Sequence, residues 1–445
     1  MEKSLTVKSI EKAKMYPIIF LMLLFSLLLF SGCQTKGKPV PAVGNEPTLA
    51  AESASNNSDI SVTNKTDLST GNITSKSHQS ITISSASNES TSAISDKAVS
   101  GKDKRTSVTL LAVGDNLIHT QVVQSGKRRD GTYNYDFLYK NIKADVSAAD
   151  IAIVNQETIL GGKSHPHSGY PNFNSPTEIG DALVDTGFNV VLHATNHAMD
   201  MRTGGIYHTL AFWDRHPDIT VLGIHKTRKS YDTIKMIEKN GIKIALLNYT
   251  YGLNGYTLPK DKPYLVNLLD KKKMEKDIKE AKSKADFTIV FPHWGTEYMY
   301  QPSKMQKELT DFFYNQGVDL IIGSHPHVLE PVKWIETKKE HRMLVYYSLG
   351  NFISYQKEAP RMLGGMAKVT ITKASAGTYI TDASITPIVT HYENGPANYH
   401  YAIYKLKDYN AKLAKSHGVS DIAQQGSLSY PGLCKLAKQI LGPWY

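Results

Sequence analysis

Short runs of β-branched and other apolar residues recur after Thr106, and helix-like stretches separate several of them. The apolar runs are 108–113, 151–154, 190–192, 219–222, 242–247, 287–291, 320–322, 343–347 and 366–371. Apolar runs without alternation indicate strands buried on both faces of a sheet. The amphipathic stretches, at 177–186, 204–214, 272–284 and 303–316, would cover those faces. The pattern therefore predicts a layered α/β domain over residues 106–390.

The pattern changes toward the C-terminus. Residues 378–390 alternate apolar and polar side chains, which predicts a strand of a more open sheet. The stretch from Tyr401 to Ala414 is interpreted as a surface helix. Residues 391–445 as a whole are therefore expected to form a helical extension packed on the domain.

The N-terminus has the layout of an export signal. Four lysines precede an almost unbroken apolar stretch from Pro17 to Phe30, which is short for a transmembrane helix. Ser31 and Gly32 then precede Cys33, and small residues before a cysteine resemble the cleavage site of bacterial lipoproteins. We expect residues 1–33 to be a lipoprotein signal peptide, with an uncleaved signal anchor as the alternative. Both place the domain outside the cell membrane, and lipidated Cys33 would anchor it there.

Residues 34–105 are rich in Ser, Thr and Asn, and no Phe, Tyr or Trp occurs between residues 31 and 132. Such a segment cannot bury enough apolar surface to offset the entropy lost on ordering. We therefore expect a disordered linker, with a random-coil reach of about 45 Å that would hold the domain away from the bilayer.

Charge and cysteine content narrow the possible partners. The chain carries a formal charge of +10, of which about +8 remains without residues 1–33, and this favours anionic partners. No arginine-rich block or basic and aromatic alternation indicates nucleic acid. The two cysteines are Cys33 and Cys434, so lipidation of the first leaves no possible disulfide.

Polar side chains follow five of the predicted strands. They are Asp115, Glu157, Asn196 with His197, His293, and His325 with His327. The carboxyl ends of strands in open α/β sheets are where ligands bind. Each residue alone has an ordinary explanation, such as a turn, a helix cap or a packed core histidine. Their shared position predicts one common polar site.

The candidate set contains carboxylates, an amide and imidazoles but no thiolate, which suits a hard or borderline divalent metal. We expect one or two ions such as Mn²⁺ or Zn²⁺. His325 and His327 would lie on one side of an extended segment, and Glu157 could bridge two ions. Paired ions polarise a phosphoryl or acyl oxygen and generate a hydroxide nucleophile.

A series of motifs along residues 107–388 resembles the CapA family of poly-γ-glutamate capsule biosynthesis proteins. The motifs are Gly114-Asp115, Asn155-Gln156-Glu157, 170–176 (YPNFNSP), Thr195-Asn196-His197 with Asp200 and Gly205, 293–298 (HWGTEY), 323–328 (GSHPHV) and 347–352 (YSLGNF). That family resembles calcineurin-like metallophosphoesterases, so the resemblance implies a β-sandwich flanked by helices.

The phosphoesterase pattern implies roles for individual residues. Asp115 would match the first metal aspartate, Glu157 the bridging carboxylate and Asn196 the amide ligand. His293, His325 and His327 would match the later metal histidines. His197 would be the neighbouring catalytic acid, which protonates the leaving group or stabilises its charge.

This sequence departs from those patterns at three positions. Leu117 stands where the phosphoesterases have a metal histidine, so a complete dinuclear centre is in doubt unless His119 substitutes. The bridging residue is Glu157 where they have aspartate. Arg202 stands where the CapA family commonly has glycine.

Three functions remain open from the sequence. The favoured interpretation is an envelope-anchored component of poly-γ-glutamate synthesis or export, which contacts that polymer or another anionic polymer and other capsule synthesis proteins. Its reaction would be that of a metal-dependent hydrolase, directed at a phosphoester or a γ-glutamyl bond. The alternatives are a secreted metal-dependent phosphoesterase and a non-catalytic polymer-binding module.

Overall fold

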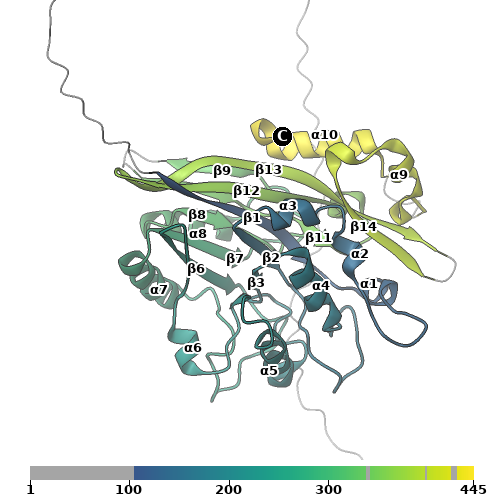
Figure 1. Cartoon of the computed structure of the whole chain (residues 1–445), viewed down its shortest axis with the longest axis horizontal. Coiled ribbons are helices and arrows are strands. Elements are labelled where there is room, and N and C mark those ends of the chain that lie inside the picture. The colour runs from purple at the N-terminus through teal and green to yellow at the C-terminus, as the bar shows by residue number, and fades with distance from the viewer. Residues whose placement is uncertain (1–104, 337–340, 396–397, 422–427) are drawn as a thin grey trace, which may run out of the picture. The chain divides into compact units, whose positions relative to one another are not determined.

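The computed structural model describes residues 105–336, 341–395, 398–421 and 428–445 (Figure 1). Its strands are β1 (Thr106–Asn116), β2 (Ile151–Asn155), β3 (Val190–Leu192), β4 (Thr220–Leu222), β5 (Lys235–Lys239), β6 (Ile242–Thr250), β7 (Phe287–His293), β8 (Leu320–Ile322), β9 (Val332–Glu336), β10 (Arg342–Tyr346), β11 (Asn351–Ile353), β12 (Leu363–Ala374), β13 (Gly377–Asn394) and β14 (Tyr399–Lys405). Its α-helices are α1 (Thr120–Ser125), α2 (Asp136–Tyr139), α3 (Lys143–Ser147), α4 (Glu178–Thr186), α5 (Arg202–Trp213), α6 (Arg228–Asp232), α7 (Lys271–Lys284), α8 (Lys304–Asn315), α9 (Ala411–Ser416) and α10 (Tyr430–Leu441). The expected signal peptide with Cys33, and the expected linker up to residue 104, lie outside the described residues.

The strands form two sheets. The first has the order β14-β13-β12-β1-β2-β3-β4, and β11 pairs with the end of β1. Its strands β1 to β4 are parallel, whereas β12, β13 and β14 join as antiparallel neighbours. The second sheet has the order β5-β6-β7-β8-β10-β9, with β6, β7, β8 and β10 parallel. One hydrophobic cluster contains side chains of both sheets, so the two sheets pack on each other.

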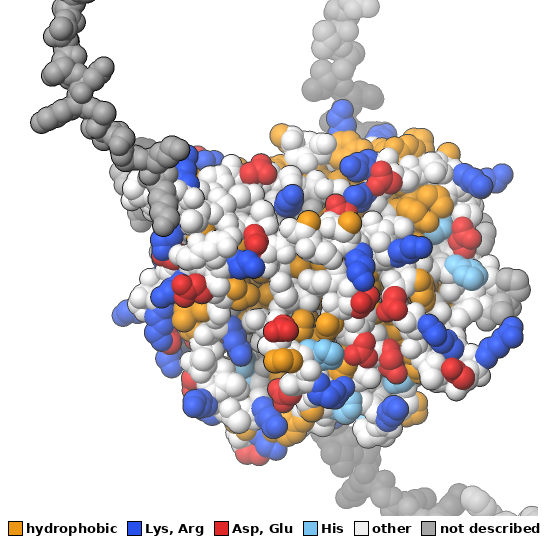
Figure 2. All heavy atoms as spheres, viewed as in Figure 1, with side chains coloured by type: hydrophobic (Ala, Val, Ile, Leu, Met, Phe, Trp, Pro, Cys, Tyr) orange, Lys and Arg blue, Asp and Glu red, His pale blue; other side chains and the backbone are white. Residues whose placement is uncertain are grey.

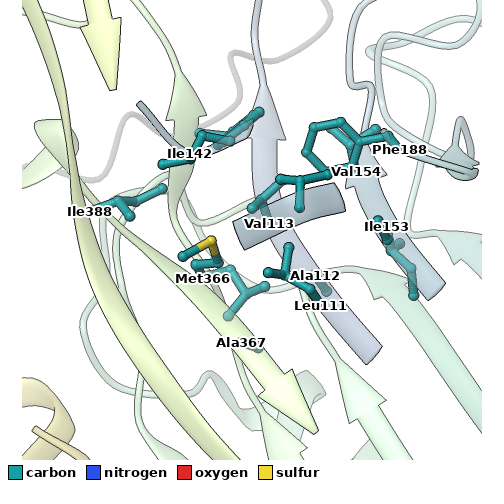
Figure 3. Packing of buried hydrophobic residues seen from close by; sticks show 14 of the residues in the cluster. Leu111, Ala112, Val113, Ile142, Ile153, Val154, Phe188, Met366, Ala367 and Ile388 are labelled. Atoms are coloured by element: carbon teal, nitrogen blue, oxygen red, sulfur yellow. The ribbon is translucent and has the colours of Figure 1, made fainter. Parts of the chain in front are cut away.

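Strand β6 shows how the second sheet is buried on both faces. Ile244 and Leu246 belong to the cluster shared with the first sheet, part of which is drawn in Figure 3. The alternate residues Ala245 and Leu247 pack in a separate cluster with apolar side chains of α7 and α8. Because successive strand residues point to opposite faces, a continuous apolar run is what this position requires.

The helices start where the sequence supplies caps. Asp270 accepts a hydrogen bond from the backbone N–H of Lys273 at the start of α7. Ser303 and Gln306 form a capping box at the start of α8. In the part of the chain that the structure describes, none of the helices combines the length and apolar character needed to cross a bilayer.

The predicted layered α/β domain, a β-sandwich flanked by helices, is confirmed, and each apolar run after Thr106 coincides with or overlaps a strand. The strand predicted over 378–390 is confirmed, since these residues lie in β13, but the helix predicted to start at Tyr401 is wrong. Tyr401 starts no helix but lies in β14, and the boundary expected at residue 390 falls inside β13. Tyr401 and Ile403 are buried and their neighbours are less so, which is the period of two of a strand that covers the edge of β13. The helical part of 391–445 is α9 and α10 with short 3-10 turns.

Gly114 allows the end of β1 to approach the turn before β11. A Cβ atom at this position would lie 1.9 Å from the carbonyl oxygen of Gly350, which itself accepts a hydrogen bond from the backbone N–H of Asp115 at 2.9 Å. Only glycine allows this close approach of the two backbones, and the approach sets the position from which the Asp115 side chain extends.

Gly114→Ala should lower the free energy of unfolding by about 3 kcal/mol, the upper end of the usual cost of overpacking. The clash is with backbone, which cannot rotate away as a side chain can. Urea unfolding of the variant measures this cost. Gly204→Ala is the control, because nothing lies within 4 Å of a Cβ atom there and alanine favours the helix. Equal stability of the two variants would contradict the close approach.

Candidate metal centre

The predicted site residues come together at the carboxyl ends of strands from both sheets. Asp115 is the last residue but one of β1, Glu157 follows β2, and Asn196 lies in the loop after β3, all on the side of the first sheet. His293 ends β7, and His325 and His327 follow β8 in the second sheet. All six side chains are buried, with residue exposures of 0 to 3%. The structure therefore brings the predicted residues into one place.

Glu157 lies between the two sides of this cluster. Its Oε1 atom is 3.7 Å from Nε2 of His293 and 3.8 Å from Nε2 of His327. His327 Nδ1 is 3.0 Å from Oδ2 of Asp115, and His293 Nε2 is 2.9 Å from Oδ1 of Asn196. The His325 ring lies near both of these histidines, with its centroid 4.9 Å from that of His293 and 5.9 Å from that of His327.

Several buried polar atoms of the cluster have no hydrogen-bond partner among the described residues. They are both carboxylate oxygens of Glu157, Nδ1 of His325 and Oδ1 of Asn155. Burying such atoms unpaired is costly, and a bound cation removes that cost for a carboxylate and an imidazole. Two groups, Asp115–Glu157–His327 and Glu297–His325–His327, each place their ligand atoms within 4.8 Å of one another. The donor set therefore fits a divalent metal.

Without a bound ion, the ionisation of these groups follows from their burial and from their contacts with one another. Burial raises the pKa of Glu157 well above its ordinary value, and the nearby Asp115 adds to this. Burial alone would lower the pKa of His327, but the Glu157 and Asp115 carboxylates outweigh it and raise the pKa to about 9. Burial and neighbouring imidazoles hold the pKa of His293 and of His325 well below the ordinary value, which keeps both in the neutral form that binds metal.

A second layer of polar side chains fixes how the candidate ligands are oriented. Asn155 donates a hydrogen bond from Nδ2 to Oδ1 of Asp115 at 2.8 Å. Ser324 Oγ lies 2.9 Å from Nδ1 of His293, which leaves Nε2 facing Glu157. Such partners select the ring nitrogen that faces a metal.

His197 is held beside the cluster by other groups. Its Nδ1 atom is 2.7 Å from Oδ2 of Asp200, and the same carboxylate oxygen accepts a hydrogen bond from the backbone N–H of Phe173. The Phe173 ring packs edge-on to the imidazole, with the two ring centroids 4.6 Å apart. Asn254 Nδ2 lies 3.0 Å from Nδ1 of His197. This arrangement orients the imidazole, and its role as an acid stays a prediction.

Sequence reasoning missed several residues of the site. Asp200 and Asn155 were part of quoted motifs without a role, although Asp200 stands three residues after His197 on the chain. Glu297 was likewise quoted only within the 293–298 motif, without a role. His119, considered as a substitute for the histidine missing at Leu117, belongs to neither group of candidate ligand atoms. Its Nδ1 accepts a hydrogen bond from the backbone N–H of Tyr355, and its ring packs edge-on against Phe173.

Comparison with known proteins assigns the family. Residues 109–356 match the model of the family described as bacterial capsule synthesis protein PGA_cap, and this segment contains every residue of the cluster. The chain belongs to the PGA_cap family. This PGA_cap protein is 31% identical over 254 residues to the PGA biosynthesis protein CapA of Bacillus subtilis (strain 168), an alignment that covers 56% of this chain and 63% of that protein.

A second PGA_cap relative is the capsule biosynthesis protein CapA of Bacillus anthracis, with 28% identity over 254 residues, 55% of this chain and 59% of the relative. The alignments therefore span less than two thirds of the length of either relative. Similar solved structures include a novel phosphatase of Mycoplasma pneumoniae, with a TM-score of 0.40, 15% identity and coverage of 64% of this chain and 95% of that chain. Another is the calcineurin-like phosphoesterase YfkN of Bacillus subtilis, with a TM-score of 0.37, 15% identity and coverage of 64% and 91%. With TM-scores below 0.5, neither likeness bears on the reaction.

Proposed function

We propose that this PGA_cap protein acts in poly-γ-glutamate capsule synthesis or export as a lipid-anchored protein on the extracytoplasmic face of the cell membrane. The proposed role in capsule synthesis is supported by the family membership of the chain and by its 31% and 28% sequence identity to two CapA proteins. The Cys33 segment supports the location. The metal centre would be the reactive site, acting as a hydrolase on a γ-glutamyl or phosphoester bond.

The observation that carries a reactive role is the buried carboxylate of Glu157, unpaired and lying between His293 and His327. Asp115, Glu157, Asn196, His293, His325 and His327 would hold one or two ions such as Mn²⁺ or Zn²⁺. A divalent ion bound there supplies Lewis-acid activation of an acyl or phosphoryl oxygen. His197, oriented by Asp200, gives a proton to the leaving group from beside the ligands.

The proposed partner is an anionic polymer, poly-γ-glutamate in first place, together with other capsule synthesis proteins. The positive net charge favours its approach. On the face seen in Figure 2, Lys and Arg side chains are interspersed with Asp and Glu. Local groups, more than overall charge, must therefore select the polymer.

Deletion of the gene in its capsule-forming host, followed by complementation, tests this function. The wild-type gene should restore the amount and chain length of surface poly-γ-glutamate, and a gene with Glu157→Gln should not. Restoration by the variant would contradict a reactive centre and support a polymer-binding module. An unchanged capsule on deletion, with phosphoester hydrolysis by the purified chain, would instead support the secreted phosphoesterase.

Cys33→Ser tests the anchor. The variant should lose its acyl chains and either leave the membrane fraction or keep an intact signal segment. Stable anchoring needs the two chains of a diacyl group, since a single acyl chain binds a bilayer only marginally. Mass spectrometry of the wild-type membrane form should find acyl groups on Cys33 as its N-terminus. A wild-type protein that still begins at Met1 would rule the lipoprotein out.

A further inference from the structure

Arg202 lies at the start of α5, close to His197, and has no part in the metal centre. Its side chain is exposed, and its Nη1 atom donates hydrogen bonds to the backbone carbonyls of Met199 at 3.2 Å and Asp200 at 3.4 Å. The side chain of Asp200 binds Nδ1 of His197. The guanidinium is therefore tied to the segment that orients the proposed acid.

The guanidinium of Arg202 stacks on the ring of Tyr256, with its central carbon 3.6 Å from the ring centroid. The Tyr256 hydroxyl donates a hydrogen bond to Oδ1 of Asn172, which fixes the ring. Two residues earlier on the same loop, Asn254 accepts a hydrogen bond from Asn196 at 3.1 Å and contacts His197. The loop that carries Tyr256 thus also contacts both polar residues at the end of β3.

Arg202 has no acidic partner among the described residues, whereas two other arginines that lie over tyrosine rings do. Arg228 pairs with Asp232, and Arg361 pairs with Glu358 while also lying over Tyr298. Stacking of a guanidinium on an aromatic face leaves N–H groups at its edge free to bind a further group. That edge matches two oxygens of a carboxylate or phosphate.

We propose that Arg202, held flat on Tyr256, is a binding subsite for an oxyanion of the substrate beside His197. This inference rests on the proposed function, in which the oxyanion is a side carboxylate of a γ-linked glutamate chain. A carboxylate bound at Arg202 fixes the register of the chain, because each γ-linked residue carries one such group. Free phosphate or a phosphoester is the other source of the same chemistry.

A matched pair of variants tests the subsite. Arg202→Gln and Arg215→Gln remove the same charge from exposed arginines, one at the first residue of α5 and one two residues past its last. Arg215 also lies over an aromatic ring, with its central guanidinium carbon 5.0 Å from the centroid of Phe212. The full chain, extracted in detergent, is titrated with a γ-linked glutamate oligomer and separately with inorganic phosphate. Arg202→Gln should weaken oligomer binding about tenfold or more, as expected for the loss of a charge-assisted contact. Arg215→Gln should leave it within about twofold, since an exposed distant charge contributes little.

Each outcome separates the subsite from the proposed function. Equal weakening by both variants, or none by either, overturns the subsite and leaves polymer binding by the protein intact. Phosphate binding that Arg202→Gln weakens, with no oligomer binding by the wild type, supports the subsite and overturns the poly-γ-glutamate function. Failure of the wild type to bind either probe overturns both. Thermal unfolding of the two variants should match the wild type, and Tyr256→Leu should reproduce part of the loss at Arg202.

Discussion

Replacing Glu157 with glutamine should weaken divalent metal binding at least about 100-fold, because a residue that only supports a ligand already contributes about 10-fold to 100-fold. Glutamine has the same shape but lacks the charge, and one of its two terminal atoms cannot bind a cation. Metal content by mass spectrometry, after incubation with Mn²⁺ or Zn²⁺, measures the effect. Wild-type protein should also gain about 2.7 kcal/mol of stability at an ion concentration of 100 Kd, and the variant should not.

A second prediction for Glu157→Gln concerns the stability of the metal-free protein. The Glu157 carboxylate is buried and both of its oxygens lack hydrogen-bond partners among the described residues, but it also attracts the His327 imidazole. Removing the charge relieves the first cost and loses the second contact, so the stability of the metal-free protein should change little. Glu330→Gln is the matched control, because Glu330 is also buried and lies outside the metal cluster. Its Oε1 atom has no hydrogen-bond partner among the described residues, and its Oε2 atom accepts a hydrogen bond from Gln306. The Glu330→Gln variant should keep the metal. Undiminished metal binding by Glu157→Gln would remove Glu157 from the ligand set.

Replacing His197 with alanine should lower turnover at least about tenfold while the metal stays bound. General acid catalysis usually contributes about 10² to 10⁴ in rate, so tenfold is a cautious lower limit. The prediction follows from the position of His197, next to the candidate ligand Asn196 but bound by Asp200 and packed on Phe173. Activity on the γ-glutamyl or phosphoester substrate, metal content and thermal unfolding should be measured on the same preparation.

A packed core histidine would give a different result. His197→Ala would then lower the free energy of unfolding by about 1 to 3 kcal/mol and leave the activity of each folded molecule unchanged. Loss of metal from the variant would show that His197 is itself a ligand. Asp200→Asn provides a further check, since it keeps the packing but changes the group that orients Nδ1, and it should reduce activity in the same direction.

The sequence was most informative where one physical requirement dominated. Continuous apolar runs predicted the central strands because both faces of those strands are covered, and the ends of the strands placed Asp115 and His293 in one site. Tyr401 was assigned to the wrong element because a strand that covers a sheet edge is only half buried, and its alternation is short. Glu297 was not identified as a possible ligand because it lies on an exposed loop after β7, where only the fold brings it near His325 and His327.

The site takes its donors from two separate stretches of the chain. The first sheet supplies carboxylates and an amide from residues 115–196, and the second supplies imidazoles from residues 293–327. The Asp115–His327 contact spans 212 positions, so the ion-binding geometry exists only when the two sheets are docked, and closing so long a loop costs chain entropy. A bound ion would then link the two sheets. Separation of the sheets after proteolytic cleavage of the chain between them would release the ion.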